Sequence, residues 1–246
     1  MTNIRERLTA HYQKAVDNYG RDAVLGVFLY GSWNYNTNFP DSDVDTKCIL
    51  IPDLYHLACK PYETKHLAVD DEVCECMTIQ HMIANWKKQN INFVEVLFTP
   101  YYIVNPMYEE LWKKFKAEMA NYIASYDIKK AVLSMSYQAL NTYKQNPNDN
   151  KKQMNMTRIC ASLHRLTSQC FDYWDCIAFE DEVADELRDI RLHGALPADI
   201  KDRLDNLEWY IAHADDYESD PFLQQWVDTK LDDWTLEFIR VRLDKS

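Results

Sequence analysis

The chain has 246 residues, of which 47% are apolar and 13% aromatic, and its formal net charge is −12. This composition supports a sizeable hydrophobic core and argues against global disorder. No apolar run approaches the ~20 residues that span a bilayer, and residues 1–7 lack the apolar stretch of a signal peptide, so we expect a cytoplasmic protein without membrane contact.

The first part of the chain is predicted to mix helices with strands. Short apolar runs bounded by Gly, Pro, Asn and Asp indicate strands, and an apolar residue every three to four positions indicates a helix. In chain order, the pattern predicts a helix over 3–20, strands over 24–30 and 44–51 around a polar loop at 33–42, an irregular or partly helical segment over 53–70, a strand over 72–78, a helix over 79–89 and a strand over 93–98.

The pattern changes after Pro106, where no further strand is indicated. The segments with helical periodicity are 107–119, 128–144, 154–176, 180–192, 198–214 and 221–243. We therefore expect an α+β protein of two domains, with an α/β domain over residues 1–106 and an all-α helical domain over residues 107–246.

Charge and glycine content narrow the kinds of phosphate site that are possible. Between Lys129 and Cys170 there are seven Lys or Arg residues against one acidic residue, whereas residues 171–246 carry 21 Asp or Glu against 8 Lys or Arg. The basic stretch could meet phosphates, and the acidic tail favours solubility or a basic partner. The chain has only four glycines, which excludes a G-x-G-x-x-G fingerprint and a P-loop.

The most informative segment is Y-G-S-W-N-Y-N-T-N-F-P-D-S-D-V-D-T-K-C-I-L-I-P, from Tyr30 to Pro52. Gly31 and Ser32 end a buried run, where a glycine permits a sharp turn close to a phosphate and the hydroxyl adds a donor. Asp43 and Asp45 follow some ten residues later and alternate along the next strand, so their carboxylates share a face about 7 Å apart. Such a pair fits hard cations that bridge a triphosphate. The segment therefore predicts a metal-dependent nucleotide site.

This motif resembles the signature of the DNA polymerase beta-like nucleotidyltransferase superfamily. A longer match adds F-V-E-V-L-F-T-P and L-H-R-L, and is similar to the bacterial and phage family of predicted nucleotidyltransferases related to RNA-repair-associated polymerase-beta-like proteins. The match covers roughly residues 24–170. It implies a polymerase-beta-like catalytic domain in the N-terminal part, with Mg²⁺ or Mn²⁺ on Asp43 and Asp45 and a nucleoside triphosphate on Gly31 and Ser32. Relatives carry Asn-Pro where this chain has Asn90-Ile91-Asn92, a departure at the turn before the last strand.

The superfamily uses a third carboxylate on an adjoining strand, flanked by apolar residues. The resemblance implies that this group binds metal and takes the proton of the acceptor hydroxyl. Glu95, in V-E-V, and Glu75, in C-E-C, both fit this pattern. Glu95 is favoured because it follows a helix, in the strand–helix–strand order of the superfamily, and Glu75 stays open as the alternative.

Basic side chains are candidates for contact with the nucleotide phosphates. Arg158 and Arg165 lie seven apart on one predicted helix and so share a face. In the resembling family, basic residues at this spacing face the cleft, and a guanidinium fork suits phosphate oxygens. The alternative is a solvated face that pairs with the acidic tail. Lys47 could contact a phosphate or neutralise the two aspartates, and Lys151 and Lys152 are expected to be surface charges.

Three classes of function are compatible with these features. The favoured class is an enzyme that transfers a nucleoside monophosphate from a nucleoside triphosphate to an unidentified hydroxyl of an RNA end, a protein or a small molecule, and releases pyrophosphate. The net charge weakens the case for a nucleic acid acceptor. A non-catalytic nucleotide-binding or antitoxin-like regulatory protein is an alternative, although the intact motif argues against it. A metal-dependent phosphohydrolase is another, but it would not need the Gly-Ser turn.

Overall fold

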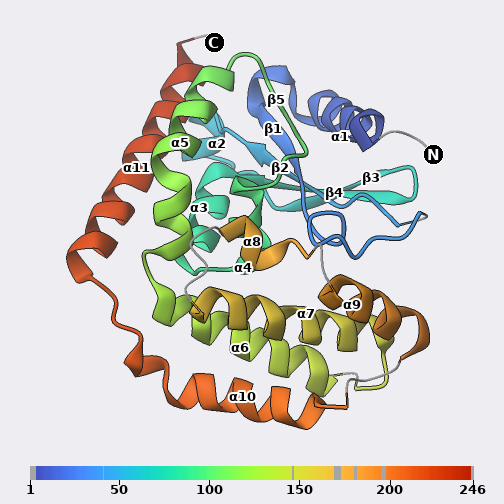
Figure 1. The fold of residues 1–246 in the computed structure, drawn as a ribbon. Coiled ribbons are helices and arrows are strands. Elements are labelled where there is room, and N and C mark those ends of the chain that lie inside the picture. The colour runs from blue at the N-terminus through green and yellow to red at the C-terminus, as the bar shows by residue number, and fades with distance from the viewer. Residues whose placement is uncertain are drawn as a thin grey trace.

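A computed structural model describes residues 4–40, 42–145, 147–168, 173–179, 182–194 and 198–244. The chain has an α+β fold, in which a five-stranded mixed sheet in the N-terminal part is followed by a helical C-terminal part (Figure 1). The elements of the N-terminal part are α1 (Ile4–Tyr19), β1 (Val24–Leu29), β2 (Thr46–Leu50), α2 (Leu54–Ala58), β3 (Lys65–Val69), β4 (Glu72–Thr78), α3 (Ile79–Lys87), α4 (Ile91–Val94) and β5 (Tyr102–Val104).

The sheet has the strand order β3-β4-β2-β1-β5. Strand β1 runs antiparallel to both β2 and β5, and β3 runs antiparallel to β4. Strands β2 and β4 are parallel, with Lys47 opposite Glu75 in the register. The central position of β1 and β2 buries every residue in both strands, which explains the continuous apolar sequence of β1, whereas β2 also buries the polar side chains of Thr46 and Lys47.

Two hydrophobic clusters cover the two faces of the sheet. On one face, Leu8 and Ala15 of α1 pack with Val27 and Leu29 of β1. On the other face, Phe28 of β1 lies against Trp112 of α5, with ring centroids 4.7 Å apart. The alternation of β1 therefore sends neighbouring residues into separate clusters, as expected for a strand buried on both sides.

The prediction of a strand over residues 93–98 is wrong. This segment contains the end of α4 and a 3-10 turn, η2 (Glu95–Leu97). The side chain of Asn90 caps α4 by accepting a hydrogen bond from the Asn92 N–H at 3.2 Å. Residues Val94 to Leu97 are buried in succession, and short buried apolar runs of this kind do not separate helix from strand.

Two edge strands, β3 and β5, were not predicted from the sequence. Strand β3 falls in the segment expected to be irregular, and four of its five residues are not buried. Strand β5 has three residues, none of them fully buried. Both strands lack the apolar alternation by which a half-buried strand is predicted. They form at the two edges of the sheet, where backbone pairing with a single neighbour is sufficient.

The helices predicted after Pro106 are present. They are α5 (Glu109–Ser125), α6 (Ile128–Gln145), α7 (Asn150–Thr167), α8 (Tyr173–Ile177), α9 (Glu182–His193), α10 (Ile200–Ala212) and α11 (Pro221–Leu243). The helix expected over 154–176 corresponds to α7 and α8, and residues 169–172 between them lie outside the described residues. In Figure 1, α6, α7, α9 and α10 form a layer below the sheet, whereas α5 and α11 run alongside it.

Helices α5 and α11 share a core with the sheet. Trp112 and Phe115 of α5 pack with Phe238 of α11 and Phe28 of β1 in one cluster. Arg242, near the end of α11, donates to the Ile51 carbonyl and to Asp53. The hydrophobic cluster thus continues across residue 106, and a division into two independently folding domains stays a prediction.

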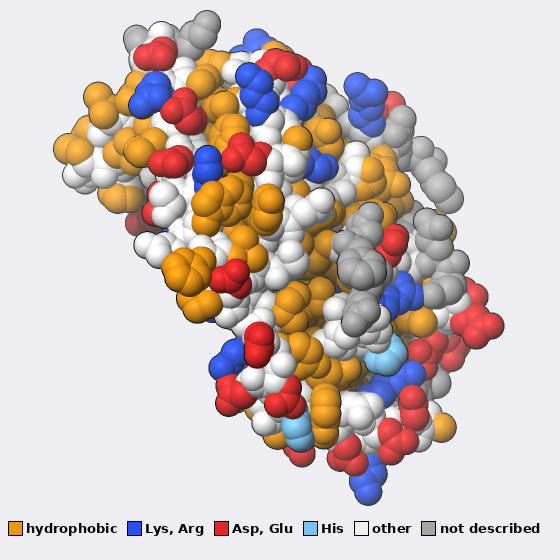
Figure 2. All heavy atoms as spheres, turned by 60° about the vertical axis from the view of Figure 1, so that its left-hand side comes forward, with side chains coloured by type: hydrophobic (Ala, Val, Ile, Leu, Met, Phe, Trp, Pro, Cys, Tyr) orange, Lys and Arg blue, Asp and Glu red, His pale blue; other side chains and the backbone are white. Residues whose placement is uncertain are grey.

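The surface beside α11 mixes apolar and charged side chains. Figure 2 turns the left-hand side of Figure 1 toward the viewer and shows hydrophobic side chains at the surface among acidic and basic ones. Large apolar side chains that α11 leaves exposed are Phe222, Trp226 and Leu236. Among the helices of the described residues, none is long and apolar enough to cross a membrane.

Candidate functional site

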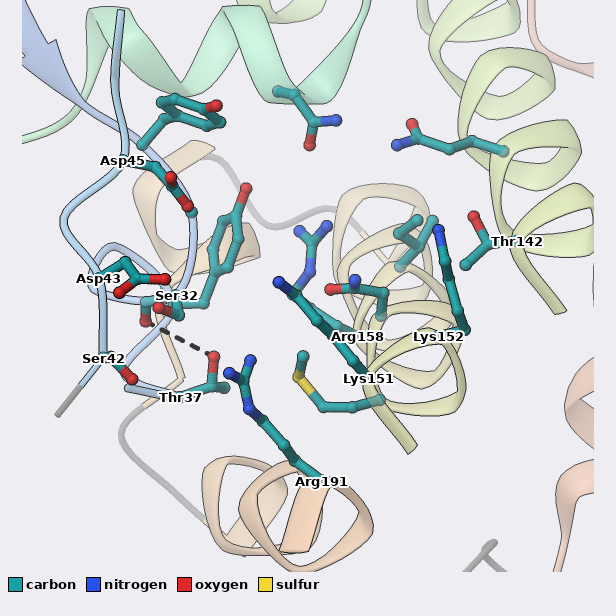
Figure 3. A pocket seen from close by; sticks show the side chains of 18 residues that line it. Ser32, Thr37, Ser42, Asp43, Asp45, Thr142, Lys151, Lys152, Arg158 and Arg191 are labelled. Carbon is teal, nitrogen blue, oxygen red and sulfur yellow. Dashed lines mark hydrogen bonds between the residues drawn. The ribbon is translucent and has the colours of Figure 1, made fainter. Parts of the chain in front are cut away.

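A cavity of about 280 Å³ lies between the sheet and the helical layer, and both parts of the chain line it. Its lining residues are Tyr30, Gly31, Ser32, Tyr35, Thr37, Ser42, Asp43, Asp45 and Asn92 from the N-terminal part, and Gln138, Thr142, Lys151, Lys152, Met154, Asn155, Arg158, Ile159 and Arg191 from the helices. Figure 3 shows Asp43, Asp45 and Ser32 on one wall, with Lys151, Arg158 and Arg191 reaching toward them from the other. The cavity therefore has an acidic wall and a basic wall.

The turn that follows β1 brings Gly31 and Ser32 to the cavity. Gly31 has φ +88, a conformation that strains residues with a side chain, so a glycine is required here. Its carbonyl accepts a hydrogen bond from the Asn34 N–H at 2.9 Å, and the Ser32 carbonyl accepts one from the Thr37 N–H at 3.0 Å. These bonds close a compact turn over residues 31–37 at the position of the Gly-Ser motif, and we call it the phosphate loop after the contact that the motif predicts.

Asp43 and Asp45 lie immediately before β2, which begins at Thr46. Val44 between them is fully buried, Asp43 is exposed and Asp45 is half-buried. Both aspartates line the cavity on either side of the buried Val44, although they precede the strand along which they were predicted to alternate. Burial raises the pKa of Asp45, and the positive charge of Lys151 across the cavity opposes that rise.

Glu72 of β4 holds the backbone between Asp43 and Asp45 in place. Its carboxylate accepts a hydrogen bond from the Val44 N–H at 3.0 Å, and it pairs with Arg7 and His11 of α1, the latter at 2.9 Å. The role of Glu72 could not be predicted from the sequence, because it depends on the packing of α1 against β2 and β4. This anchor holds the backbone that positions Asp43 and Asp45.

The basic wall is centred on Arg158 of α7. Its side chain is only 3% exposed, and its guanidinium lies 3.9 Å from the centre of the Tyr35 ring. Among the described residues, nothing hydrogen-bonds to its Nε and Nη1 atoms. Buried cations are almost always paired, so this guanidinium is poised to receive an anion from the cavity.

Arg165 does not join Arg158 at the cavity. Its Nη1 donates to the carbonyls of Asp175 and Ala178, at 2.9 and 3.1 Å, and its guanidinium lies 4.5 Å from the Phe179 ring. The expectation that the two arginines share one face toward the nucleotide is therefore wrong for Arg165. It instead holds the segment that follows α8.

Lys47 also lies outside the lining of the cavity. It is buried between the rings of Tyr30 and Phe93, at 3.9 and 4.2 Å, and forms an ion pair with Glu75 on the neighbouring strand. Of the two expectations for Lys47, charge neutralisation fits this arrangement: its ion-pair partner is Glu75, and its positive charge also opposes the rise in the pKa of Asp45. The Glu75 side chain is 19% exposed.

Glu95 is fully buried beneath the phosphate loop and not on a strand beside the aspartates. It accepts hydrogen bonds from the Gly31 N–H at 3.3 Å, from Asn34 Nδ2 at 3.1 Å and from the Tyr35 hydroxyl at 2.7 Å. Burial raises its pKa to about 7, while the Tyr35 hydrogen bond and the charge of Arg158 act in the opposite direction. The structure thus does not bring Glu95 together with Asp43 and Asp45.

Three basic residues of the site were missed or misjudged from the sequence. Lys151 and Lys152 were expected to be plain surface charges, yet both line the cavity. The excess of Lys and Arg between residues 129 and 170 was a signal for them. No feature of the sequence indicated that Arg191 lines the cavity, because it reaches the cavity through the packing of α9 against α7.

The carboxylate oxygen atoms that a divalent cation could use in the cavity belong to Asp43 and Asp45. Within the described ranges, no group of three His, Cys, Asp or Glu side chains forms a ready metal site. Asp43 and Asp45 nevertheless line the same wall, and Mg²⁺ is commonly bound by one or two carboxylates together with substrate phosphates and water. Two aspartates that face a basic wall therefore fit a cation of this kind, provided that the remaining ligands come from water and a bound anion.

Comparison of the sequence with models of known protein families, and with curated proteins, finds no match for this chain.

Proposed function

We propose that the chain is a polymerase-beta-like nucleotidyltransferase, which transfers a nucleoside monophosphate from a nucleoside triphosphate to a hydroxyl acceptor. The observation that carries the proposal is the pairing, within one cavity, of two carboxylates with a buried arginine whose Nε and Nη1 have no hydrogen-bond partner in the described part of the chain. A nucleoside triphosphate bound with Mg²⁺ matches both walls, because its cation suits Asp43 and Asp45 and its phosphates suit Arg158.

Different residues of the cavity would bind the phosphates and the metal ion. The turn at Gly31 lets the backbone approach the phosphates closely, and Ser32 supplies a hydroxyl beside them. Lys151, Arg158 and Arg191 face this turn and stabilise the negative charge of the triphosphate chain. Asp43 and Asp45 would hold Mg²⁺, which supplies charge stabilisation when the acceptor oxygen displaces pyrophosphate from the α-phosphorus.

Glu75 fits the third carboxylate better than Glu95. It lies on β4, parallel to the strand that Asp45 precedes, and its register partner Lys47 points to the same side of the sheet as Asp45. Glu95 is sealed from the cavity and already accepts three hydrogen bonds. Like Lys47, Glu75 lies outside the lining of the cavity, but its carboxylate is partly exposed, and we therefore assign proton removal from the acceptor hydroxyl to Glu75.

The direct test follows each phosphate of the substrate. The protein is incubated with Mg²⁺, a cell extract and nucleoside triphosphates labelled at the α- or the γ-phosphorus. We expect label from the α-position, and not from the γ-position, to become attached to an acceptor, with an equal amount of pyrophosphate released. Release of inorganic phosphate alone would indicate a phosphohydrolase, and tight binding without turnover would indicate a non-catalytic nucleotide-binding protein.

Arg158→Ala is expected to weaken triphosphate binding by about tenfold to a hundredfold, since charge-assisted hydrogen bonds to phosphate are lost. Binding of the bare nucleoside should change little. Arg165→Ala is the matched control on the same helix, and it should leave both affinities as in the parent protein because Arg165 binds backbone carbonyls away from the cavity. Calorimetric titration of each variant with a non-hydrolysable triphosphate and with the nucleoside measures these values. Equal triphosphate affinity in Arg158→Ala and the parent would contradict the assignment.

Glu75→Gln is expected to lower the turnover number by about a hundredfold while the affinity for the triphosphate stays the same, because the amide cannot accept the acceptor proton. Single-turnover rates and equilibrium binding, measured on the same preparation, separate the two effects. Glu63→Gln, an exposed glutamate outside the cavity, serves as the control and should keep the parent rate. A parent-like rate in Glu75→Gln would remove Glu75 from the chemical step.

A further inference from the structure

The buried carboxylate of Glu95 lies directly under the phosphate loop and bonds to it at three points. The donors are one backbone amide, at Gly31, and two side chains, of Asn34 and Tyr35. All three belong to the turn that presents Ser32 to the cavity. One group supplied by η2 thus fixes the backbone and the side chains of this turn together.

Asn34 forms two further hydrogen bonds, one to the end of β1 and one to Thr99. Its Nδ2 also donates to the Leu29 carbonyl at 3.1 Å, and its Oδ1 accepts from the Thr99 hydroxyl at 2.8 Å. Asn34 and Thr99 are both buried. The polar atoms beneath the phosphate loop are therefore joined in one buried network, an arrangement that specifies a single conformation when its members are satisfied.

Tyr35 connects Glu95 to the basic wall. Its hydroxyl donates to Glu95, and its ring lies 3.9 Å from the guanidinium of Arg158. The negative charge of Glu95 and the ring of Tyr35 both favour a buried cation at Arg158. Glu95 thereby influences both sides of the cavity, although its own side chain does not reach it.

We infer that Glu95 is a positioning residue, which holds the phosphate loop and, through Tyr35, Arg158 in the arrangement that receives a nucleoside triphosphate. This inference rests on the proposed function. Because the carboxylate is fully buried and engaged by three donors, it acts on the nucleotide only through the groups that it holds. Preorganisation of this kind increases affinity by lowering the conformational cost of binding.

The test compares Glu95→Gln, Glu95→Ala and Tyr35→Phe with a control variant of similar burial. Asn105→Ala is that control, because Asn105 is 2% exposed and donates to the carbonyls of Arg21 and Val24, at 2.8 and 3.0 Å, near the opposite end of β1. Each variant is titrated with α,β-methylene nucleoside triphosphates and Mg²⁺. Amide hydrogen exchange of residues 30–37 is followed in parallel without nucleotide.

Glu95→Gln keeps the shape of the side chain but replaces one acceptor oxygen with a donor. We expect it to weaken triphosphate affinity by about tenfold and to accelerate exchange in the phosphate loop. Tyr35→Phe, which keeps the ring beside Arg158, should show a smaller loss in the same direction and covers the case in which Glu95→Ala does not fold. Asn105→Ala should lose stability yet keep its affinity within about twofold of the parent.

Two results would overturn the inference while leaving the proposed function intact. One is parent-like affinity and exchange in Glu95→Gln. The other is an equal loss of affinity in Asn105→Ala, which would reduce Glu95 to a general contributor to stability. If the parent protein itself binds no nucleoside triphosphate, the proposed function fails, and the inference that rests on it fails as well.

Discussion

Asp43→Asn is expected to reduce Mg²⁺-dependent nucleotidyl transfer by roughly a thousandfold, because a carboxylate that holds the metal contributes several kcal/mol of charge stabilisation to the reaction. The Asp43 side chain is exposed, and the hydrogen bond that holds this residue runs from Trp33 Nε1 to its backbone carbonyl at 3.0 Å, which the substitution leaves in place. The fold should therefore survive the change. Initial rates of pyrophosphate release across a range of Mg²⁺ concentrations provide the measurement.

The control for this experiment is Asp71→Asn. Asp71 is an exposed aspartate in the turn between β3 and β4, and it does not line the cavity. It should keep the parent rate and the parent dependence on Mg²⁺. Retention of full turnover in Asp43→Asn, with the same dependence on Mg²⁺, would show that the metal is held elsewhere and would remove the basis for the proposed function.

The second large effect is a pH dependence of stability that Glu95 introduces. Burial raises the pKa of Glu95 from its ordinary value of 4.5 to about 7 in the folded chain. The folded state therefore holds this proton more tightly than the unfolded state. The resulting stability is fully present below pH 4.5 and is lost as pH rises through 7. The shift corresponds to about 3 kcal/mol in total, of which about 2 kcal/mol falls between pH 5.5 and pH 8.

Comparison with Glu95→Gln isolates this contribution, because the amide does not titrate. The charged or titratable groups that interact with Glu95 include Tyr30, Tyr35 of the phosphate loop, Arg158 of α7 and Tyr173 of α8, and they are the same in both proteins. We expect the stability of the parent relative to Glu95→Gln to fall as pH rises from 5.5 to 8. Urea unfolding of both proteins at each pH gives the difference. A constant difference across this range would contradict a raised pKa for Glu95.

The turn at Gly31 and the placement of the aspartate pair could be predicted because each depends on local geometry. A glycine is needed where the backbone takes φ +88, and alternation around the buried Val44 places the two aspartates on one side. The helices after Pro106 were likewise evident, since an amphipathic helix repeats its apolar residues at short range. Such features depend on interactions between residues that are close in the sequence, and for that reason they can be predicted from it.

Residues whose roles depend on distant segments could not be placed in this way. Arg158 and Arg165 share a helix face, but seven residues separate them by about 10 Å along the axis, so they meet different neighbours. One reaches the cavity beside Tyr35, and the other meets the carbonyls that follow α8. A face shared on one helix does not specify which surroundings each residue contacts.

Glu95 is the clearest example of a residue whose position depends on tertiary packing and not on local sequence. Its sequence, a carboxylate between two valines, suits a strand that presents the carboxylate to a metal, and it equally suits a buried turn. The sequence by itself determined the Gly-Ser turn, the aspartate pair and the order of the helices. Only the tertiary structure decided that Glu95 lies beneath the phosphate loop, that Glu75 faces Lys47, and that Arg191 reaches the cavity, because those positions arise from packing between segments far apart in the chain.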